Sequence, residues 1–480
     1  MFLISTIITL PIIGAIFTAC CDKEKNENSF NLNKVIVLIN SLISFKLFFD
    51  YINYGNYTSF QESFFLLSFL GVFNLGIDAL SLLLILTLNL LFAFVLFLNK
   101  KNINHEDSRT NQAWYMVLYA CLLGAFLSKN LLLFYIFFEI TIIPIFFLLF
   151  NIENVEQTKA AYKYLFYSFI SSIPMLLSIL FVLNELGSVN LSEIKNLPMN
   201  LEMQKIAILG FLISLGVKIP LLPFNTWIVS TYKNANAKTV LILSSLISKM
   251  APYALITFVT CLFKDAFLEY RNILIALSLI SSFYSAVCAY YEKNLKSMLA
   301  YASMSHMGIF LAGLSIFNLE SIMGSCIFLI SHSFISFGMF LFAEILFAKV
   351  GSYEIGAFSG LAKMLPKFSS LNFLMFLGFI SFPLSLAFIA EFLIMFGAFK
   401  YCILSCLILL LINILSAIYP LKLLAKTIWG EAAPITLKDI SFKEQGILSL
   451  ILGIVFLFGI YPKPIIKFLE SDIKSQEVSK

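Results

Sequence analysis

Six titratable side chains stand alone inside long apolar stretches of this 480-residue chain. They are two glutamates, two lysines and two histidines: Glu139, Lys218, Lys249, His306, His332 and Glu391. Carboxyl, ammonium and imidazole groups can accept and release protons, and histidine does so near neutral pH. A set of such groups, brought to one level by the fold, could pass protons from one to the next.

The overall composition predicts the medium in which these groups work. The chain has 60% hydrophobic and 12% charged residues, with a mean hydropathy of +0.93. Ordinary globular domains carry about 25% charged residues, so the composition excludes a soluble protein and favours a single membrane domain. The net charge of +5 is spread thinly, and no basic run exceeds Lys100-Lys101. Nucleic-acid binding is therefore not expected.

Fourteen apolar stretches are candidates to cross a bilayer, which takes about 20 residues as a helix. We therefore predict an all-α polytopic membrane protein with about 14 transmembrane helices. The stretches lie near residues 2–20, 34–52, 77–98, 114–128, 130–149, 163–184, 205–230, 238–263, 272–291, 296–317, 320–348, 370–399, 402–428 and 445–462.

The distribution of basic residues supports this number of spans. Connections after odd-numbered spans hold 19 Lys and Arg residues, whereas connections after even-numbered spans hold six. Because positive residues accumulate on the cytoplasmic side, the odd connections are predicted to be cytoplasmic and both termini to lie outside. Four lysines beyond the last span do not follow this trend.

The seventh and twelfth stretches contain prolines that predict broken helices. The first holds residues 216–223, with Lys218 between Gly216 and Pro220, and the second holds Pro383 shortly before Glu391. Proline removes a backbone donor, and in a bilayer the freed carbonyls must meet protein or water. Either break alone could be an ordinary proline kink. Two breaks five spans apart, each beside an ionisable residue, indicate structural repeats with sites near mid-membrane.

The six titratable residues fall at similar depths. Counted from the span ends at about 1.5 Å per residue, they lie about 14 to 20 Å into the membrane. A charge at that depth costs about 2.5–3.5 kcal/mol or more, so six coincidences at one level are not expected. The row predicts lateral proton transfer inside the membrane.

Simpler interpretations exist for individual members of the row. Glu139 and Lys218 could form a static buried ion pair, and each histidine could be a satisfied core residue. Asp78 and Glu344 lie near span ends, and we expect them to orient neighbouring groups or to snorkel rather than to relay protons.

Short stretches around these residues resemble the antiporter-like membrane subunits of respiratory complex I. The matching stretches are 134–139, 216–227, 248–253, 299–308, 331–333 and 390–392. Residues 299–308, which read LAYASMSHMG, are among the most specific signatures of that family. The resemblance extends over about residues 76–462. Relatives in the same family belong to multisubunit sodium–proton antiporters and membrane hydrogenases.

Glu391 is the residue that discriminates between members of the family. The resemblance assigns glutamate at this position to M-type subunits, the counterparts of mitochondrial subunit 4. L-type subunits, N-type subunits and the antiporter relatives mostly carry lysine there. L-type subunits also have a long C-terminal lateral helix, for which the residues after Pro462 leave no room. The chain is therefore most similar to the M-type subunits of NADH-quinone oxidoreductase.

The resemblance also implies an architecture. It implies two inverted five-helix repeats, in residues 112–264 (helices 4–8) and 267–428 (helices 9–13). Helices 7 and 12 are the broken ones. Helices 1–3 precede the repeats in residues 1–100, and helix 14 with a tail follows in residues 429–480. Together they are expected to form one membrane domain.

The function implied by the resemblance is proton translocation without redox chemistry in this chain. Quinone reduction elsewhere in the complex would drive it. By the same resemblance Glu139 pairs with Lys218, and Lys249 is the central relay. The two histidines of the row continue the relay, and Glu391 ends it.

The expected partners are the bilayer and other membrane subunits of complex I, including neighbouring antiporter-like subunits and the lateral helix of the L-type subunit. The resemblance places the chain in the bacterial cytoplasmic membrane. No cofactor or metal is expected, because the eight cysteines form no CxxC pair and no dinucleotide or phosphate-binding motif is present.

The chain departs from the family pattern at two places. Asn225 and the residues Ser230 to Tyr232 replace usual family residues after the first break, and residues 294–297 read NLKS instead of Asp-Leu-Lys-Arg. We expect both changes to lie near the membrane surfaces, where they would affect proton entry or exit.

Two other functions remain open. The first is a cation–proton antiporter subunit of a multisubunit antiporter or membrane hydrogenase, which would use the same row. The second is a haem b carrier ligated by His306 and His332, which would need two histidines on neighbouring helices.

Overall fold

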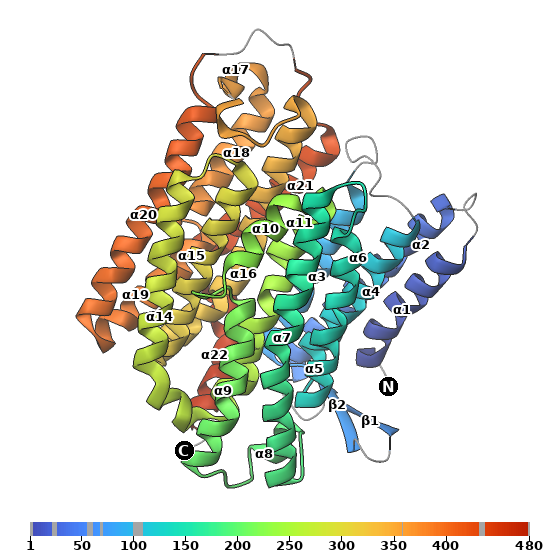
Figure 1. The fold of residues 1–480 in the computed structure, drawn as a ribbon, viewed down its shortest axis with the longest axis vertical. Helices are drawn as coiled ribbons and strands as arrows, with labels where there is room; N and C mark the ends of the chain where they lie inside the picture. The colour runs from blue at the N-terminus through green and yellow to red at the C-terminus, as the bar shows by residue number, and fades with distance from the viewer. Residues whose placement is uncertain are drawn as a thin grey trace.

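The computed structural model describes residues 3–21, 26–54, 61–67, 71–98, 109–357, 359–431 and 437–478. Within these ranges the protein is a bundle of long helices that run side by side along its longest axis (Figure 1). The predicted boundary at residue 100 lies outside the described residues.

The N-terminal part contributes three long helices and a small hairpin. The helices are α1 (Leu3–Cys20), α2 (Asn26–Tyr54) and α3 (Ala79–Phe97). Between α2 and α3, strands β1 (Gln61–Leu67) and β2 (Gly71–Gly76) pair antiparallel, an element that the sequence did not predict. The hairpin lies at the lower end of the bundle in Figure 1, which we call the hairpin end.

The next part of the chain contains the first broken helix. Its helices are α4 (Arg109–Leu127), α5 (Leu131–Ile140), α6 (Ile142–Leu149), α7 (Val155–Leu186), α8 (Leu191–Ile194), α9 (Leu201–Lys218), α10 (Thr226–Asn234), α11 (Ala237–Ser245), α12 (Met250–Ala254) and α13 (Thr260–Leu262). A 3₁₀ turn (Ile247–Lys249) and a π-helical turn (Leu255–Val259) connect α11, α12 and α13 into one irregular span.

The C-terminal part contains the second broken helix. Its helices are α14 (Lys264–Tyr291), α15 (Leu295–Ile316), α16 (Leu319–Val350), α17 (Leu361–Met364), α18 (Pro366–Phe379), α19 (Leu386–Tyr401), α20 (Ile403–Thr427), α21 (Phe442–Ile460) and α22 (Lys463–Val478). The most apolar part of α16 is wholly buried and that of α15 nearly so, whereas α7 and α20 expose much of theirs. The core therefore lies around α15 and α16.

Eleven helical stretches of the described chain are long and apolar enough to cross a membrane. The other three predicted spans coincide with α4 and with the two broken pairs, α9/α10 and α18/α19. Helices α10, α18 and α19 are each shorter than 18 residues, and α9 has 18 residues but carries three charged ones, Glu202, Lys205 and Lys218.

Both predicted breaks are present. Helix α9 ends at Lys218, and Pro220 follows with a φ of 24° before α10 begins. Helix α18 ends at Phe379, and Ser381 and Leu384 have φ angles of 53° and 79° before α19 begins. Positive φ is costly for residues other than glycine, so these turns depend on the surrounding packing.

Glycines bring each broken helix close to a neighbour. A Cβ on Gly210 of α9 would lie 2.2 Å from the carbonyl oxygen of Pro174 on α7. A Cβ on Gly324 of α16 would lie 2.8 Å from the carbonyl oxygen of Ala390 on α19. Small residues permit such close approach between membrane helices, and here they fix the depth at which each break lies.

Candidate functional site

Lys218 occupies the last position of α9, where the helix dipole favours a cation. Its Nζ donates to Ser168 Oγ at 2.7 Å and to the Tyr164 hydroxyl at 3.4 Å, both on α7. The ammonium also lies 4.8 Å from the centre of the Tyr164 ring, a favourable cation–π distance. The first break thus presents a lysine to a polar face of α7.

Glu139 lies on α5, just before the irregularity that separates α5 from α6. Its carboxylate lies near Ser172, whose hydroxyl donates to the Phe169 carbonyl at 2.8 Å, and has Lys218 as the nearby opposite charge. Among the described residues, no ion pair within 4.0 Å joins it directly to Lys218. Ser168 and Ser172 are one turn apart on the same face of α7. The two charges therefore act on each other across a short row of hydroxyls.

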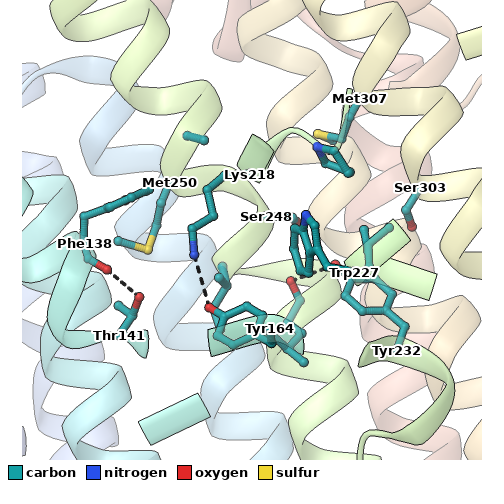
Figure 2. A pocket seen from close by; sticks show the side chains of 15 residues that line it. Phe138, Thr141, Tyr164, Lys218, Trp227, Tyr232, Ser248, Met250, Ser303 and Met307 are labelled. Atoms are coloured by element: carbon teal, nitrogen blue, oxygen red, sulfur yellow. Dashed lines mark hydrogen bonds between the residues drawn. The ribbon is translucent and has the colours of Figure 1, made fainter. Parts of the chain in front are cut away.

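A small buried cavity lies between Lys218 and the next part of the row. Its volume is about 20 Å³, which is room for about one water molecule. Ser248 and Ser303 supply polar atoms to its wall, and Lys218 and Tyr164 lie at one side (Figure 2). Because Ser248 also contacts Lys249, the cavity adjoins both lysines.

Part of the segment 225–232, which includes the departures from the family pattern, lies against this cavity. Trp227 and Tyr232 are only 5% and 2% exposed and line this cavity. The Trp227 indole donates to the Val217 carbonyl at 2.9 Å, and the Tyr232 hydroxyl donates to the Leu243 carbonyl at 3.2 Å.

Lys249 lies at the centre of the row and is 1% exposed. Its Nζ contacts the Ser244 carbonyl at 3.0 Å, Ser248 Oγ at 2.8 Å and His332 Nδ1 at 2.8 Å. These three contacts match the three donors of an ammonium group. The 3₁₀ turn at Ile247–Lys249 distorts the span at this residue, and His332 belongs to the buried helix α16.

The two histidines lie edge to face, with ring centres 5.6 Å apart. His306 is on α15, and both rings are 4% exposed. Phe328 stacks on His332, and Phe379 packs against His306 with ring centres 5.3 Å apart. The surroundings of the pair are thus aromatic, apart from Lys249.

Glu391 lies farther along, on α19, and is 7% exposed. Its hydrogen-bond partner is Ser381, in the turn that breaks the helix. Phe379, which packs against His306, also packs against Tyr419 with ring centres 6.2 Å apart, and Tyr419 lies within electrostatic reach of Glu391. The structure therefore brings five predicted residues into a nearly continuous polar row. From His306 toward Glu391 the contacts are aromatic and run through Phe379 and Tyr419.

The sequence argument missed three buried lysines, Lys129, Lys238 and Lys296. Lys129 pairs with Asp78, and Lys296 pairs with Glu344 at 2.7 Å, where their side chains are 2% and 10% exposed. Of the two roles expected for Glu344, orienting a neighbouring group fits this ion pair better than snorkelling, and its carboxylate also accepts from the Tyr353 hydroxyl at 2.9 Å. Each partner was visible as a charge at a span end, but sequence alone does not pair residues that lie so far apart in the chain.

Residues 128–417 match the family described as NADH:quinone oxidoreductase/Mrp antiporter, TM. This match covers more than half of the chain and includes all six residues of the row. The chain belongs to this family. The membership confirms the resemblance inferred from the short motifs.

Named relatives extend the likeness over nearly the whole chain. NADH-quinone oxidoreductase subunit M of Rickettsia prowazekii is 28% identical over 98% of both chains. NADH-ubiquinone oxidoreductase chain 4 of Arabidopsis thaliana is 27% identical over 99% of this chain and 97% of its own. NADH-quinone oxidoreductase subunit 13 of Thermus thermophilus is 30% identical over 81% of each.

Solved structures agree with these relatives. A chain of respiratory complex I from Thermus thermophilus with bound NADH superposes with a TM-score of 0.89, at 25% identity and 99% coverage of both chains. A chain of the Mrp complex from Dietzia sp. DQ12-45-1b gives a TM-score of 0.87 at 15% identity, covering 100% of this chain and 99% of its own. The second likeness concerns the fold alone.

Proposed function

We propose that this chain is a proton-translocating, non-redox membrane subunit of an NADH-quinone oxidoreductase. The relatives named subunit M and chain 4 match it nearly end to end. The observation that carries the proposal is the buried hydrogen bond between Lys249 and His332, set in a row that starts at Glu139 and Lys218. Other membrane subunits of such a complex are its partners, and quinone reduction elsewhere supplies the energy.

The first step of the proposed relay takes place at Lys218. A nearby carboxylate favours the charged form of a lysine, and burial opposes it. The charge state of Glu139 therefore controls whether Lys218 holds its proton. A water in the cavity between Tyr164 and Ser248 would connect Lys218 to Lys249 without movement of either backbone.

The second step is proton sharing between Lys249 and His332. At 2.8 Å, an ammonium and an imidazolium would repel each other strongly in a buried site. The pair therefore carries one charge, either on the lysine or on the imidazole. Release from Lys249 to His332 passes that charge toward His306.

The last step ends at Glu391. The ring of Phe379 packs against His306, and the ring of Tyr419 packs against Phe379. Tyr419 lies within electrostatic reach of Glu391, and among the described residues the Tyr419 and Ser416 hydroxyls have no hydrogen-bond partner. This stretch needs side-chain rotation or entering water, which makes it the place where the relay can be interrupted.

A cation–proton antiporter subunit is the second candidate, and the similarity of fold to the Mrp complex chain favours it. It would use the same row, so sodium transport by the assembled complex is the discriminating measurement. The haem alternative is weaker. Lys249, Phe328 and Phe379 pack directly against the two histidine rings, where a porphyrin would need an open slot.

The proposal is tested by Lys218→Ala in membranes that contain the assembled complex. We expect NADH-driven proton pumping through this subunit to fall by about 100-fold, since a positioned proton-transfer group contributes at least that much. Lys159→Ala is the matched control, because Lys159 lies in an exposed ion pair with Glu156, away from the row. Normal pumping by an assembled Lys218→Ala complex would contradict the proposal.

A further inference from the structure

The turn between α10 and α11, residues 235–236, joins two elements that face the cavity between the lysines of the row. It lies away from the hairpin end, in the upper half of Figure 1. Before the turn, α10 supplies Trp227 and Tyr232 to the cavity wall, and after it the same wall receives Ser248 (Figure 2). The Ser248 hydroxyl also contacts Lys249. The position of this turn therefore affects the space between the two lysines.

A buried lysine from another helix holds the turn. Lys296, the second residue of α15, is 2% exposed, and its Nζ donates to the Ala235 carbonyl at 2.8 Å. Ala235 is the C-cap of α10 and is itself buried. Carbonyls at the end of a helix have no partner within it, and the helix dipole favours a cation there. Lys296 therefore satisfies a buried carbonyl and stabilises the end of α10.

Glu344 and Tyr353 hold the ammonium of Lys296 in this position. Glu344 Oε1 lies 2.7 Å from Lys296 Nζ, and the Tyr353 hydroxyl donates to the other oxygen of the same carboxylate at 2.9 Å. The centre of the Tyr353 ring lies 4.4 Å from Lys296 Nζ, a favourable cation–π distance. This ring stacks on Phe347, and the Tyr353 carbonyl accepts from the Leu295 N–H at 2.8 Å. The lysine is thus held through both its side chain and its backbone neighbour.

Helix α16 contacts this part of the protein at three depths. His332 contacts Lys249 at 2.8 Å, and Phe340 packs edge to face on Tyr232 with ring centres 5.5 Å apart. Glu344, one turn after Phe340, pairs with the lysine that holds the turn. At 3.6 residues per turn these three residues of α16 lie on one side of the helix. The helix that contacts Lys249 therefore also anchors α10.

We propose that Lys296, anchored by Glu344, is a positioning residue that fixes the turn between α10 and α11. Through this turn it sets the gap that a proton crosses between Lys218 and Lys249. A misplacement of about 1 Å can slow a positioned reaction about 100-fold. This role requires a cation that donates a hydrogen bond, and it does not require release of the proton. The inference rests on the proposed function, because it takes Lys218 and Lys249 as proton carriers.

The main test combines Lys296→Met with Glu344→Gln in the assembled complex. Both charges are removed together, since removal of one would leave the other buried and unpaired. We expect NADH-driven pumping to fall about 10- to 100-fold, because α10 loses its anchor. The matched control is Lys400→Met combined with Glu320→Gln, which removes an ion pair at the opposite end of α16 and should leave pumping unchanged.

The fluorescence of Trp227 reports the position of α10 independently of pumping. Its indole is buried and donates to the Val217 carbonyl, next to Lys218. The emission of Trp227 is the difference between the spectrum of each complex and that of the same complex with Trp227→Phe. In Lys296→Met/Glu344→Gln we expect this emission to shift to longer wavelength, as water reaches the indole. Normal pumping, or lost pumping with unchanged Trp227 emission, would overturn the proposal.

Two further variants separate positioning from other roles of Lys296. Lys296→Arg keeps the charge and the donors but does not release its proton, so it should retain pumping and the original Trp227 emission. Lost pumping with that emission unchanged would make Lys296 a proton carrier and overturn the proposal, whereas lost pumping with a shifted emission would support positioning. Tyr353→Phe removes only the hydroxyl that donates to Glu344 and should change pumping and emission in the same direction as the double variant, by less. If neither Tyr353→Phe nor the double variant assembled, the cluster would serve assembly and the proposal would fail.

These outcomes are distinct from failure of the proposed function. If Lys218→Ala pumps normally, the proposed function fails, whatever the variants of Lys296 do. If Lys218→Ala stops pumping while Lys296→Met/Glu344→Gln pumps normally, only the positioning role fails.

Discussion

The two broken helices of this protein place their charges on opposite sides of the break. In the first, Lys218 is the last residue of α9 and lies before the unwound turn. In the second, Glu391 is the sixth residue of α19 and lies after the turn. A helix ends with a partial negative charge at its C-terminus and begins with a partial positive charge at its N-terminus. Each break therefore carries the charge that its nearer helix end favours.

The surroundings of the two charges differ more than their positions do. Lys218 contacts two hydroxyls and adjoins a water-sized cavity. Glu391 has Ser381 as its partner, and the ring contacts that lead toward it from His306 run through Phe379 and Tyr419. The first half is thus prepared for proton movement in the structure as it stands, while the second half requires rearrangement. The part of the row around Lys218 can therefore accept protons directly, whereas transfer to Glu391 depends on a change in the surrounding side chains.

Charge reversal at Lys218 and at Glu391 should change NADH-driven pumping in both cases, and it should lower pumping much more at Lys218 than at Glu391. Lys218→Glu would put an anion at the C-terminus of α9 and close to Glu139, so we expect pumping to fall by about 100-fold or more. Glu391→Lys should cost no more than about tenfold, because the helix dipole weakens beyond the first turn. NADH-driven pumping in membranes with verified assembly is the measurement. Equal losses at the two sites would show that the dipole argument is wrong.

Alanine substitutions at the two packing glycines, Gly210 and Gly324, should differ in their effect on stability, by less than the charge reversals differ in their effect on pumping. Gly210→Ala would push a methyl group to 2.2 Å from the Pro174 carbonyl, whereas Gly324→Ala would meet the Ala390 carbonyl at 2.8 Å. Overpacking costs about 1–3 kcal/mol, and we expect the first variant to lie at the upper end of that range. The temperature at which the subunit leaves the purified complex measures the loss. Gly446→Ala is the control, because no described atom lies within 4 Å of its added methyl group.

A greater loss in Gly324→Ala than in Gly210→Ala would contradict the close approach of α9 to α7. A loss of similar size in Gly446→Ala would point to glycine flexibility as the cause, instead of packing.

Most of the helices and both breaks could be predicted from the sequence, because the properties that determine them act within a single helix. Apolar stretches of span length predicted the helices, and Pro220 and Pro383 predicted both breaks, because proline acts on its own helix. Depth counted along a regular helix brought Lys249 and His332 to one level, and the structure places them in contact. Structural features that depend only on a residue's own span, such as a helix, a break or a depth, were therefore predictable.

Features that depend on distant contacts were not. Tyr232 lines the same cavity as Lys218, a contact between two sides of an unwound turn that no local pattern predicts. The pairing of Lys296 with Glu344 joins two different helices, and no local pattern specifies it. The π-helical turn at Leu255–Val259 and the β1–β2 hairpin also depend on tertiary packing that the apolar pattern does not encode.

The most direct test of the account replaces the central lysine. Lys249→Arg keeps a positive charge beside His332, but arginine does not release its proton in proteins. If protons pass through this residue, NADH-driven pumping by the assembled complex should fall about 100-fold in Lys249→Arg, as in Lys249→Gln. Full pumping in Lys249→Arg, with pumping lost only in Lys249→Gln, would mean that the site needs a fixed charge, and would contradict proton transfer through the row.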